Sequence, residues 1–195
     1  MGYAAQNPEK DIHEPDKFQE YLALETQNPD ERYIYWDGEI FAMAGALKKH
    51  NLLAFSIALI LKRQTKGNKC QTYMENVRTQ IEEGGKYVYP DIVMTCDERD
   101  DEDALLVKYP SVIIEILSKG TELIDSSIKL VAYLKMPTMK HYLMVSQTFV
   151  VVIHYYKNEQ GEIITKFYTD LTDIIVLQGF AIELPLSQIY EDILL

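Results

Sequence analysis

The chain has 195 residues, of which 47% are hydrophobic, and its 19 basic and 30 acidic residues give a formal net charge of -11. A chain of this length predicts one domain that buries most of its apolar surface without covalent staples, and we expect no second domain. The acidic balance argues against a protein that merely coats nucleic acid, because such binding depends on Lys and Arg neutralising phosphates.

The charge is uneven along the chain. Residues 46–90 include eight basic and three acidic side chains, so a local basic face stays open as a prediction. Residues 97–103 are acidic except for one arginine. Such a run indicates a solvated loop, and we assign it no chemistry.

The two cysteines, Cys70 and Cys96, are too far apart for a local metal motif and too few for a disulfide framework. We therefore expect reduced, buried thiols, which fits a cytoplasmic protein. The first 16 residues contain no basic region followed by an apolar core, and no stretch approaches the roughly 20 apolar residues of a membrane span. Neither secretion nor membrane insertion is expected.

The N-terminal part of the chain predicts a helix, a hairpin and a longer helix. Residues 15–25 form a short amphipathic helix. Residues 32–42 form a hairpin, since Asp37 and Gly38 supply the positive φ that a tight turn demands. Residues 46–66 form a helix that is apolar nearly all round, which predicts that it packs against a sheet.

The middle of the chain predicts strands at residues 70–74, 77–81, 87–94 and 111–117. A helix follows from Gly120 to Pro137, with Ile124, Ile128 and Val131 on its core-facing stripe. The tail predicts strands at residues 141–145, 149–155 and 163–168 and a last helix from Pro185. The whole reads as one α/β (α+β) domain around a mixed β-sheet flanked by helices.

Two carboxylates, Asp91 and Glu115, lie inside the predicted apolar strands 87–94 and 111–117. A carboxylate is costly to bury unless something pairs with it. Magnesium binds oxygen ligands, takes one or two protein carboxylates and completes its shell with water and substrate. With Lys129 on the next helix to assist the nucleophile or the phosphate, this set predicts a magnesium-dependent phosphodiesterase.

Structural alternatives remain open for each of these residues. Asp91 after a proline fits a simple turn. Glu115 fits a buried ion pair with Lys129 or Arg78, and Lys129 fits a surface salt bridge with Asp125 four residues earlier.

Other residues are secondary candidates. Glu39 is either a third carboxylate or a solvated hairpin residue. His50, in the first turn of the long helix, is either a phosphate contact or a structural histidine. Arg78, from the basic segment, is the second candidate for substrate binding.

The ordered combination of these residues resembles the Uma-two family of restriction endonucleases, within the PD-(D/E)XK nuclease superfamily, from about Arg32 to the C-terminus. The residues that carry the resemblance are Asp37-Gly38-Glu39, His50, Tyr89-Pro90-Asp91, Glu115-Ile116-Leu117-Ser118, Thr121, Asp125, Lys129, Tyr133, Glu183-Leu184-Pro185-Leu186 and Ile189-Tyr190.

The resemblance implies a restriction-endonuclease-like core over residues 1–195, with residues 1–31 as an N-terminal helical extension. It implies that Asp91 and Glu115 are the acids of the second and third motifs, and that Glu39 is the best match for the first. The superfamily's lysine two residues after the second acid is replaced here by Leu117, so the resemblance implies that Lys129 takes over its role.

Further departures from the family pattern occur at His141, Ser146 and Lys119-Gly120. We expect a DNA endonuclease that uses Mg²⁺, with Mn²⁺ as the other candidate metal, and that assembles as a homodimer. The alternative is a catalytically silent homologue that serves as a binding or dimerisation module, which the negative charge favours. The migrated-lysine hypothesis requires Lys129 to face the two carboxylates rather than solvent.

Overall fold

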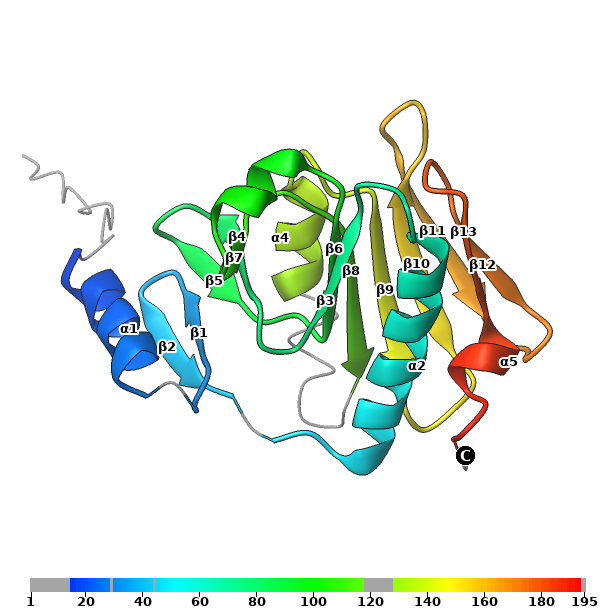
Figure 1. The fold of residues 1–195 in the computed structure, drawn as a ribbon, viewed down its shortest axis with the longest axis horizontal. Coiled ribbons are helices and arrows are strands. Elements are labelled where there is room, and N and C mark those ends of the chain that lie inside the picture. The colour runs from blue at the N-terminus through cyan, green and yellow to red at the C-terminus, as the bar shows by residue number, and fades with distance from the viewer. Residues whose placement is uncertain (1–14, 29, 44, 118–127, 194–195) are drawn as a thin grey trace, which may run out of the picture.

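The computed structural model describes residues 15–28, 30–43, 45–117 and 128–193 (Figure 1). In chain order the helices and strands are α1 (Pro15–Gln27), β1 (Tyr33–Trp36), β2 (Glu39–Ala42), α2 (Lys48–Gln64), β3 (Gln71–Met74), β4 (Arg78–Glu82), β5 (Lys86–Val88), β6 (Ile92–Thr95), the 3-10 helix η1 (Glu98–Glu102), β7 (Leu106–Val107), β8 (Pro110–Leu117), α4 (Leu130–Lys135), β9 (His141–Ser146), β10 (Val152–Lys157), β11 (Ile163–Tyr168), β12 (Ile174–Leu177), β13 (Ile182–Pro185) and α5 (Leu186–Ile189).

The strands form three sheets. One has the order β2-β1-β5-β4-β7, a second has the order β11-β10-β9-β8-β6-β3, and β12 pairs with β13 alone. The β4–β7 and β8–β9 pairs are parallel and the remaining pairs are antiparallel. The expected fold class is confirmed, since these are mixed sheets flanked by helices, but the strands divide among more than one sheet.

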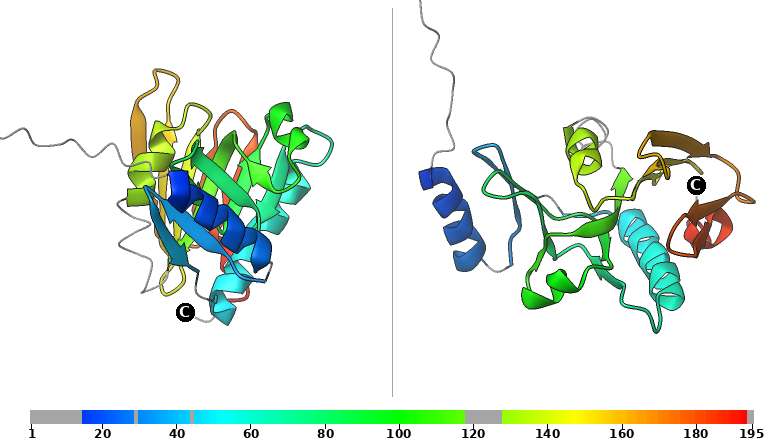
Figure 2. Two further views of the ribbon diagram at one scale, coloured as in Figure 1. Left: turned by 90° about the vertical axis from the view of Figure 1, so that its left-hand side faces the viewer. Right: turned by 90° about the horizontal axis from the view of Figure 1, so that it is seen from above.

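The six-stranded sheet is covered on both faces, and successive residues of its strands alternate between two cores. Ile92, Ile114 and Leu143 belong to the core that includes α2, α5 and the β12–β13 pair. Val93 and Ile113 belong to the core on the other face, beneath α4. Figure 2 shows α2 and α4 on opposite sides of these strands.

Helix α1 packs on the five-stranded sheet through aromatic side chains. Phe18 lies 5.3 Å from the Tyr35 ring and 5.1 Å from the Tyr87 ring, between centroids. The turn between β1 and β2 has positive φ at both central residues, 47° at Asp37 and 88° at Gly38. The predicted first helix is confirmed. The predicted hairpin is also confirmed, because the residues of its turn determine the turn locally.

The expected single strand over 87–94 is wrong. It is two strands, β5 in the five-stranded sheet and β6 in the six-stranded sheet, with Tyr89, Pro90 and Asp91 between them. Proline has no backbone N–H to donate to a ladder and restricts the residue before it, so the chain leaves one sheet here and enters the other. Asp91 consequently lies at the junction of the two sheets.

The expected core stripe of the helix before Pro137 is also wrong where it can be compared. Ile128 and Val131 are each 54% exposed, whereas Tyr133 and Met136 are buried. Ile124 lies outside the described residues. The side that faces the sheet carries Lys129, Tyr133 and Met136, and the first two bond to Glu115 there. The strand expected from Phe149 begins instead at Val152.

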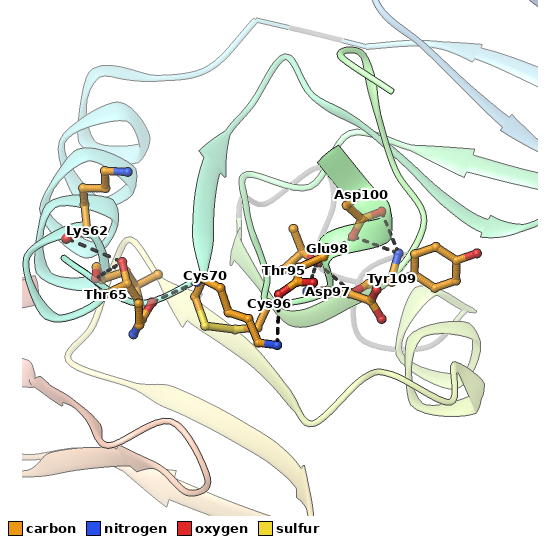
Figure 3. Close-up of a disulfide and its surroundings, with 12 residues drawn as sticks. Lys62, Thr65, Cys70, Thr95, Cys96, Asp97, Glu98, Asp100 and Tyr109 are labelled. Atoms are coloured by element: carbon orange, nitrogen blue, oxygen red, sulfur yellow. Dashed lines mark hydrogen bonds and ion pairs between the residues drawn. A yellow bond between two sulfur atoms is a disulfide. The ribbon is translucent and has the colours of Figure 1, made fainter. Parts of the chain in front are cut away.

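The expectation of reduced cysteines is wrong, since Cys70 and Cys96 form a disulfide (Figure 3). The β3–β6 register pairs Gln71 with Thr95, and one further step places the two cysteines opposite each other. The spacing of the two cysteines in the sequence could not reveal the disulfide, because it forms only in this register of the β3–β6 pair.

The acidic run is not uniformly solvated. Asp100 in η1 is buried and accepts hydrogen bonds from Thr95 Oγ1 at 2.6 Å and from the Lys108 backbone N at 2.7 Å. Its carboxylate also accepts from the Tyr109 backbone N at 3.2 Å (Figure 3). It anchors the loop before β7. No helix among the described residues is long and apolar enough to cross a membrane.

Candidate active site

Asp91 is held at the junction of the two sheets by two contacts. Its Oδ2 accepts a hydrogen bond from the Ile116 backbone N at 2.6 Å, and its Oδ1 lies 3.0 Å from His50 Nε2. The side chain is 17% exposed. Because Ile92 pairs with Ile114 in antiparallel register, the next residues, Asp91 and Glu115, come opposite each other. The carboxylate of one strand thus contacts the backbone of the other, one residue past Glu115.

Glu115 is in the interior strand β8, between β6 and β9, and is 3% exposed. Its Oε1 accepts hydrogen bonds from Lys129 Nζ at 3.1 Å and from Tyr133 OH at 2.8 Å. Residues alternate faces along a strand, so Glu115 shares the face of Ile113, which is the face that α4 covers. A carboxylate this deep is tolerable because charge-assisted hydrogen bonds satisfy it.

Lys129 immediately precedes α4 and is 7% exposed. Its ammonium bonds to Glu115 rather than pointing into bulk solvent. The migrated-lysine hypothesis, which places the ammonium near both carboxylates, stays a prediction. Leu117, two residues after Glu115, packs against the apolar core beneath α4. Thr121 and Asp125 lie outside the described residues.

His50 comes from the first turn of α2 and contacts Asp91 through Nε2. Burial lowers the pKa of His50, but the hydrogen bond and the charge of Asp91 raise it, with smaller contributions from Glu75 and Glu115, and the net shift is upward. The imidazole is therefore more often protonated than an exposed histidine at the same pH. Each site carboxylate thus has a basic partner, His50 for Asp91 and Lys129 for Glu115.

Glu75 is a neighbour of the site that sequence reasoning did not single out. It follows β3, its backbone N donates to the Asp91 carbonyl at 3.0 Å, and its φ of 48° lies in the left-handed region. Asn51 Nδ2 reaches its Oε1 at 3.5 Å. No local motif marks this residue, since only the β3–β6 pairing brings it opposite Asp91.

Two predicted residues are not brought to this cluster. Glu39 is exposed on the edge strand β2. Arg78 lies on β4 with its guanidinium 5.9 Å from the ring centroids of both Tyr21 and Tyr87, beside α1. Among the described residues, neither makes a hydrogen bond or ion pair with Asp91 or Glu115, so Lys129, not Arg78, is the ion-pair partner of Glu115.

The donor set is suited to a hard divalent cation. Asp91 and Glu115 offer carboxylate oxygens from adjacent strands, and magnesium needs few protein ligands because it keeps waters and binds substrate oxygens. Within the part of the chain that the structure describes, no group of three or more His, Cys, Asp or Glu residues is arranged to hold a metal. Carboxylate oxygens are ligands of the kind that magnesium binds, so magnesium at these two residues stays a prediction.

Comparison with known proteins gives a consistent result. The family model Uma2, described as "Putative restriction endonuclease", matches residues 18–187. A Synechocystis protein, "Uncharacterized protein slr1290", is 30% identical over 172 residues, covering 88% of this chain and 90% of the relative. A second Synechocystis protein, "Uncharacterized protein sll1609", is 31% identical over 140 residues, covering 71% of this chain and 78% of the relative.

Among solved structures, the chain is similar to a crystal structure of "a putative nuclease belonging to DUF820" from Anabaena variabilis. The TM-score is 0.74 with 18% sequence identity, over 89% of this chain and 97% of the other. At that identity the match establishes the fold.

Proposed function

Because the chain belongs to the Uma2 family, we propose that it is a Mg²⁺-dependent endonuclease that hydrolyses phosphodiester bonds in DNA. The observation that carries the proposal is that Lys129 bonds to Glu115 while Asp91 accepts a hydrogen bond from Ile116, the residue after Glu115. Asp91 precedes β6, Glu115 is in β8 and Lys129 precedes α4. Mn²⁺ is the other metal that oxygen donors of this kind bind.

In this proposal Asp91 and Glu115 would hold the metal. A bound Mg²⁺ supplies charge neutralisation at the phosphate and a lower pKa for an attacking water. Lys129 provides a fixed positive charge beside Glu115, suited to orienting the nucleophile or stabilising negative charge that develops on the phosphate. The Ile116 N–H keeps the Asp91 carboxylate turned toward the Glu115 strand. His50 supplies a second cationic group next to Asp91 and is the candidate for a phosphate contact.

The alternative is a catalytically silent homologue that binds or dimerises. One specific observation favours it: the carboxylates are already paired with internal basic side chains, His50 with Asp91 and Lys129 with Glu115. Buried ion pairs of this kind also occur as purely structural features. The net charge of -11 points the same way, because it disfavours phosphate binding.

A cleavage assay decides between the two. Supercoiled, linear duplex, branched and single-stranded DNA would be incubated with the protein with and without Mg²⁺, beside Asp91→Ala. We expect metal-dependent cleavage that Asp91→Ala abolishes. Asp170→Ala is a control, because Asp170 is an exposed loop residue whose carboxylate accepts hydrogen bonds from the backbone N and Oγ1 of Thr172. Equal cleavage by wild type and Asp91→Ala would indicate a contaminating nuclease and contradict the proposal.

We also propose a single functional domain over residues 1–195 that forms a homodimer, so that two sites could act on two strands. Light scattering at micromolar concentration tests the dimer, and a monomer would remove it. The cytoplasm is proposed as the place of action because the relatives are bacterial and bacterial DNA lies there. The disulfide argues against this location, so alkylation of thiols in intact cells is the relevant measurement.

A further inference from the structure

Tyr133 makes a polar contact with the site that sequence reasoning did not interpret. Its side chain is 0% exposed, and its hydroxyl donates to Glu115 Oε1 at 2.8 Å. Lys129 Nζ reaches the same oxygen at 3.1 Å. Residues four apart lie on one face of a helical segment. One face of the α4 segment therefore presents two donors to one carboxylate oxygen.

The direction of the Tyr133 hydroxyl is fixed by its surroundings. The ring belongs to the core beneath α4 and lies 5.1 Å from the Tyr142 ring between centroids, tilted by 59°. A tyrosine has few rotatable bonds, so a packed ring leaves its hydroxyl little freedom. The hydrogen bond is to a carboxylate, which makes it stronger than one between neutral groups.

The neighbouring side chain on the same face of β8 offers Glu115 no hydrogen-bond donor. Leu117, two residues further along the same face of β8, is apolar and packs in the core. A lysine there would have approached the carboxylate along the strand. Here Lys129 and Tyr133, from the α4 segment, supply the donors. Of these two residues, Tyr133 is the one whose side chain is held in place by ring packing.

We propose that Tyr133 is a positioning residue that fixes the Glu115 carboxylate, and Lys129 with it, in the geometry that binds the catalytic metal. The inference rests on the proposed nuclease function and deepens it. Groups that orient a ligand carboxylate typically contribute 10- to 100-fold to metal affinity or activity. Tyr133 would act through Glu115 and without contacting the substrate.

The test compares two tyrosine-to-phenylalanine variants. Tyr133→Phe keeps the packed ring and removes the donor to Glu115. Tyr190→Phe is the matched control, because its buried hydroxyl bonds to the carbonyls of Ser146 at 2.9 Å and Val151 at 3.1 Å and makes no contact with Glu115. Both remove a buried hydroxyl, so a loss of stability alone would appear in both.

The readout is the Mg²⁺ concentration that gives half-maximal cleavage, measured separately from the maximal rate and from the melting temperature. We expect Tyr133→Phe to raise that concentration about 10- to 100-fold, and Tyr190→Phe to leave it at the wild-type value. An unchanged metal requirement in Tyr133→Phe, or an equal rise in both variants, would overturn the inference.

Failure of the proposed function would be seen separately, as wild-type protein that cleaves no DNA form with either metal. Calorimetric titration with Mn²⁺ then decides the role of Tyr133. Weaker Mn²⁺ binding by Tyr133→Phe than by wild type would support the positioning role. Equal binding by the two proteins, or no binding by wild type, would overturn it.

Discussion

Removing the Glu115 carboxylate should destabilise the fold as well as abolish cleavage. Lys129 and Glu115 have side chains only 9% and 4% exposed, with Nζ and Oε1 3.1 Å apart. Glu115→Ala would remove this carboxylate from the buried Lys129 ammonium and from the Tyr133 hydroxyl. Breaking one side of a buried ion pair costs roughly 3–5 kcal/mol. For a chain of this size that corresponds to a fall in Tm of roughly 6–20 °C.

The assay is urea and thermal unfolding followed by circular dichroism, without metal, at low and high salt. The double variant Glu115→Gln/Lys129→Met should lose clearly less stability than the sum of the two single variants, because it removes both charges together. It should remain folded and inactive, which separates the contribution of the pair to stability from its contribution to catalysis.

The matched control is the exposed pair between Lys69 and Glu98, whose Nζ and Oε1 are 3.4 Å apart with side chains 66% and 75% exposed. Glu98→Ala should cost at most about 1 kcal/mol, and salt should reduce this further, whereas the Glu115 effect should persist in salt. If Glu115→Ala is as mild as Glu98→Ala, or if the two single variants are additive, then the buried pair is not the strong contact inferred here.

Three further predictions concern other parts of the molecule. Asp91→Ala should destabilise by about 1–3 kcal/mol, because the buried Ile116 N–H loses its acceptor, and chemical denaturation would measure this; an unchanged midpoint would contradict the contact. Reducing the Cys70–Cys96 disulfide should lower stability by roughly 3 kcal/mol, since it closes a loop with a sequence separation of 26; melts with and without dithiothreitol test this, and a Cys70→Ser/Cys96→Ser double variant should not respond to the reductant. Burial lowers the pKa of His154 to about 3 and also lowers the pKa of His141, to which His154 is bonded at 2.9 Å. The stability that His154 contributes is therefore fully present above its unfolded pKa of 6.5 and falls by about 1.4 kcal/mol per pH unit as the pH drops toward 3. A melting temperature that stays constant from pH 7 to 4 would refute this.

The elements that the sequence determined are those whose information is local. The turn at Asp37 and Gly38 follows from the positive φ that both residues adopt. The helix expected over 46–66 forms over Lys48–Gln64, and the positive φ of Gly67 fits the stop signal read from the sequence. Its expected packing against a sheet is also found, because Leu53, Ile57 and Leu61 follow a helical spacing that needs no tertiary information.

The residues that make up the site could be predicted only in part from the sequence. Asp91, Glu115 and Lys129 were named together from their residue types and positions, and again from a family resemblance. The structure shows Lys129 bonded to Glu115 and the Ile116 N–H bonded to Asp91, while the joint role of the three residues stays a prediction. Glu39, the best match for the first motif in that resemblance, and Arg78, from the basic segment, lie on other strands, β2 and β4. Glu75 and the role of Tyr133 were missed, because residue type and spacing do not say which side chains face each other across a sheet.

What only the tertiary structure decided depends on strand register and on which face a helix turns inward. Register placed Cys70 opposite Cys96, and Asp91 opposite Glu115 with its carboxylate on the Ile116 N–H. The α4 segment turned its Lys129 and Tyr133 side inward and left Val131 exposed, against its apolar pattern, because a buried carboxylate must be satisfied by donors. Such choices are made by contacts between residues far apart in the chain, and a one-residue slip in register would reverse which face of the strand each side chain occupies.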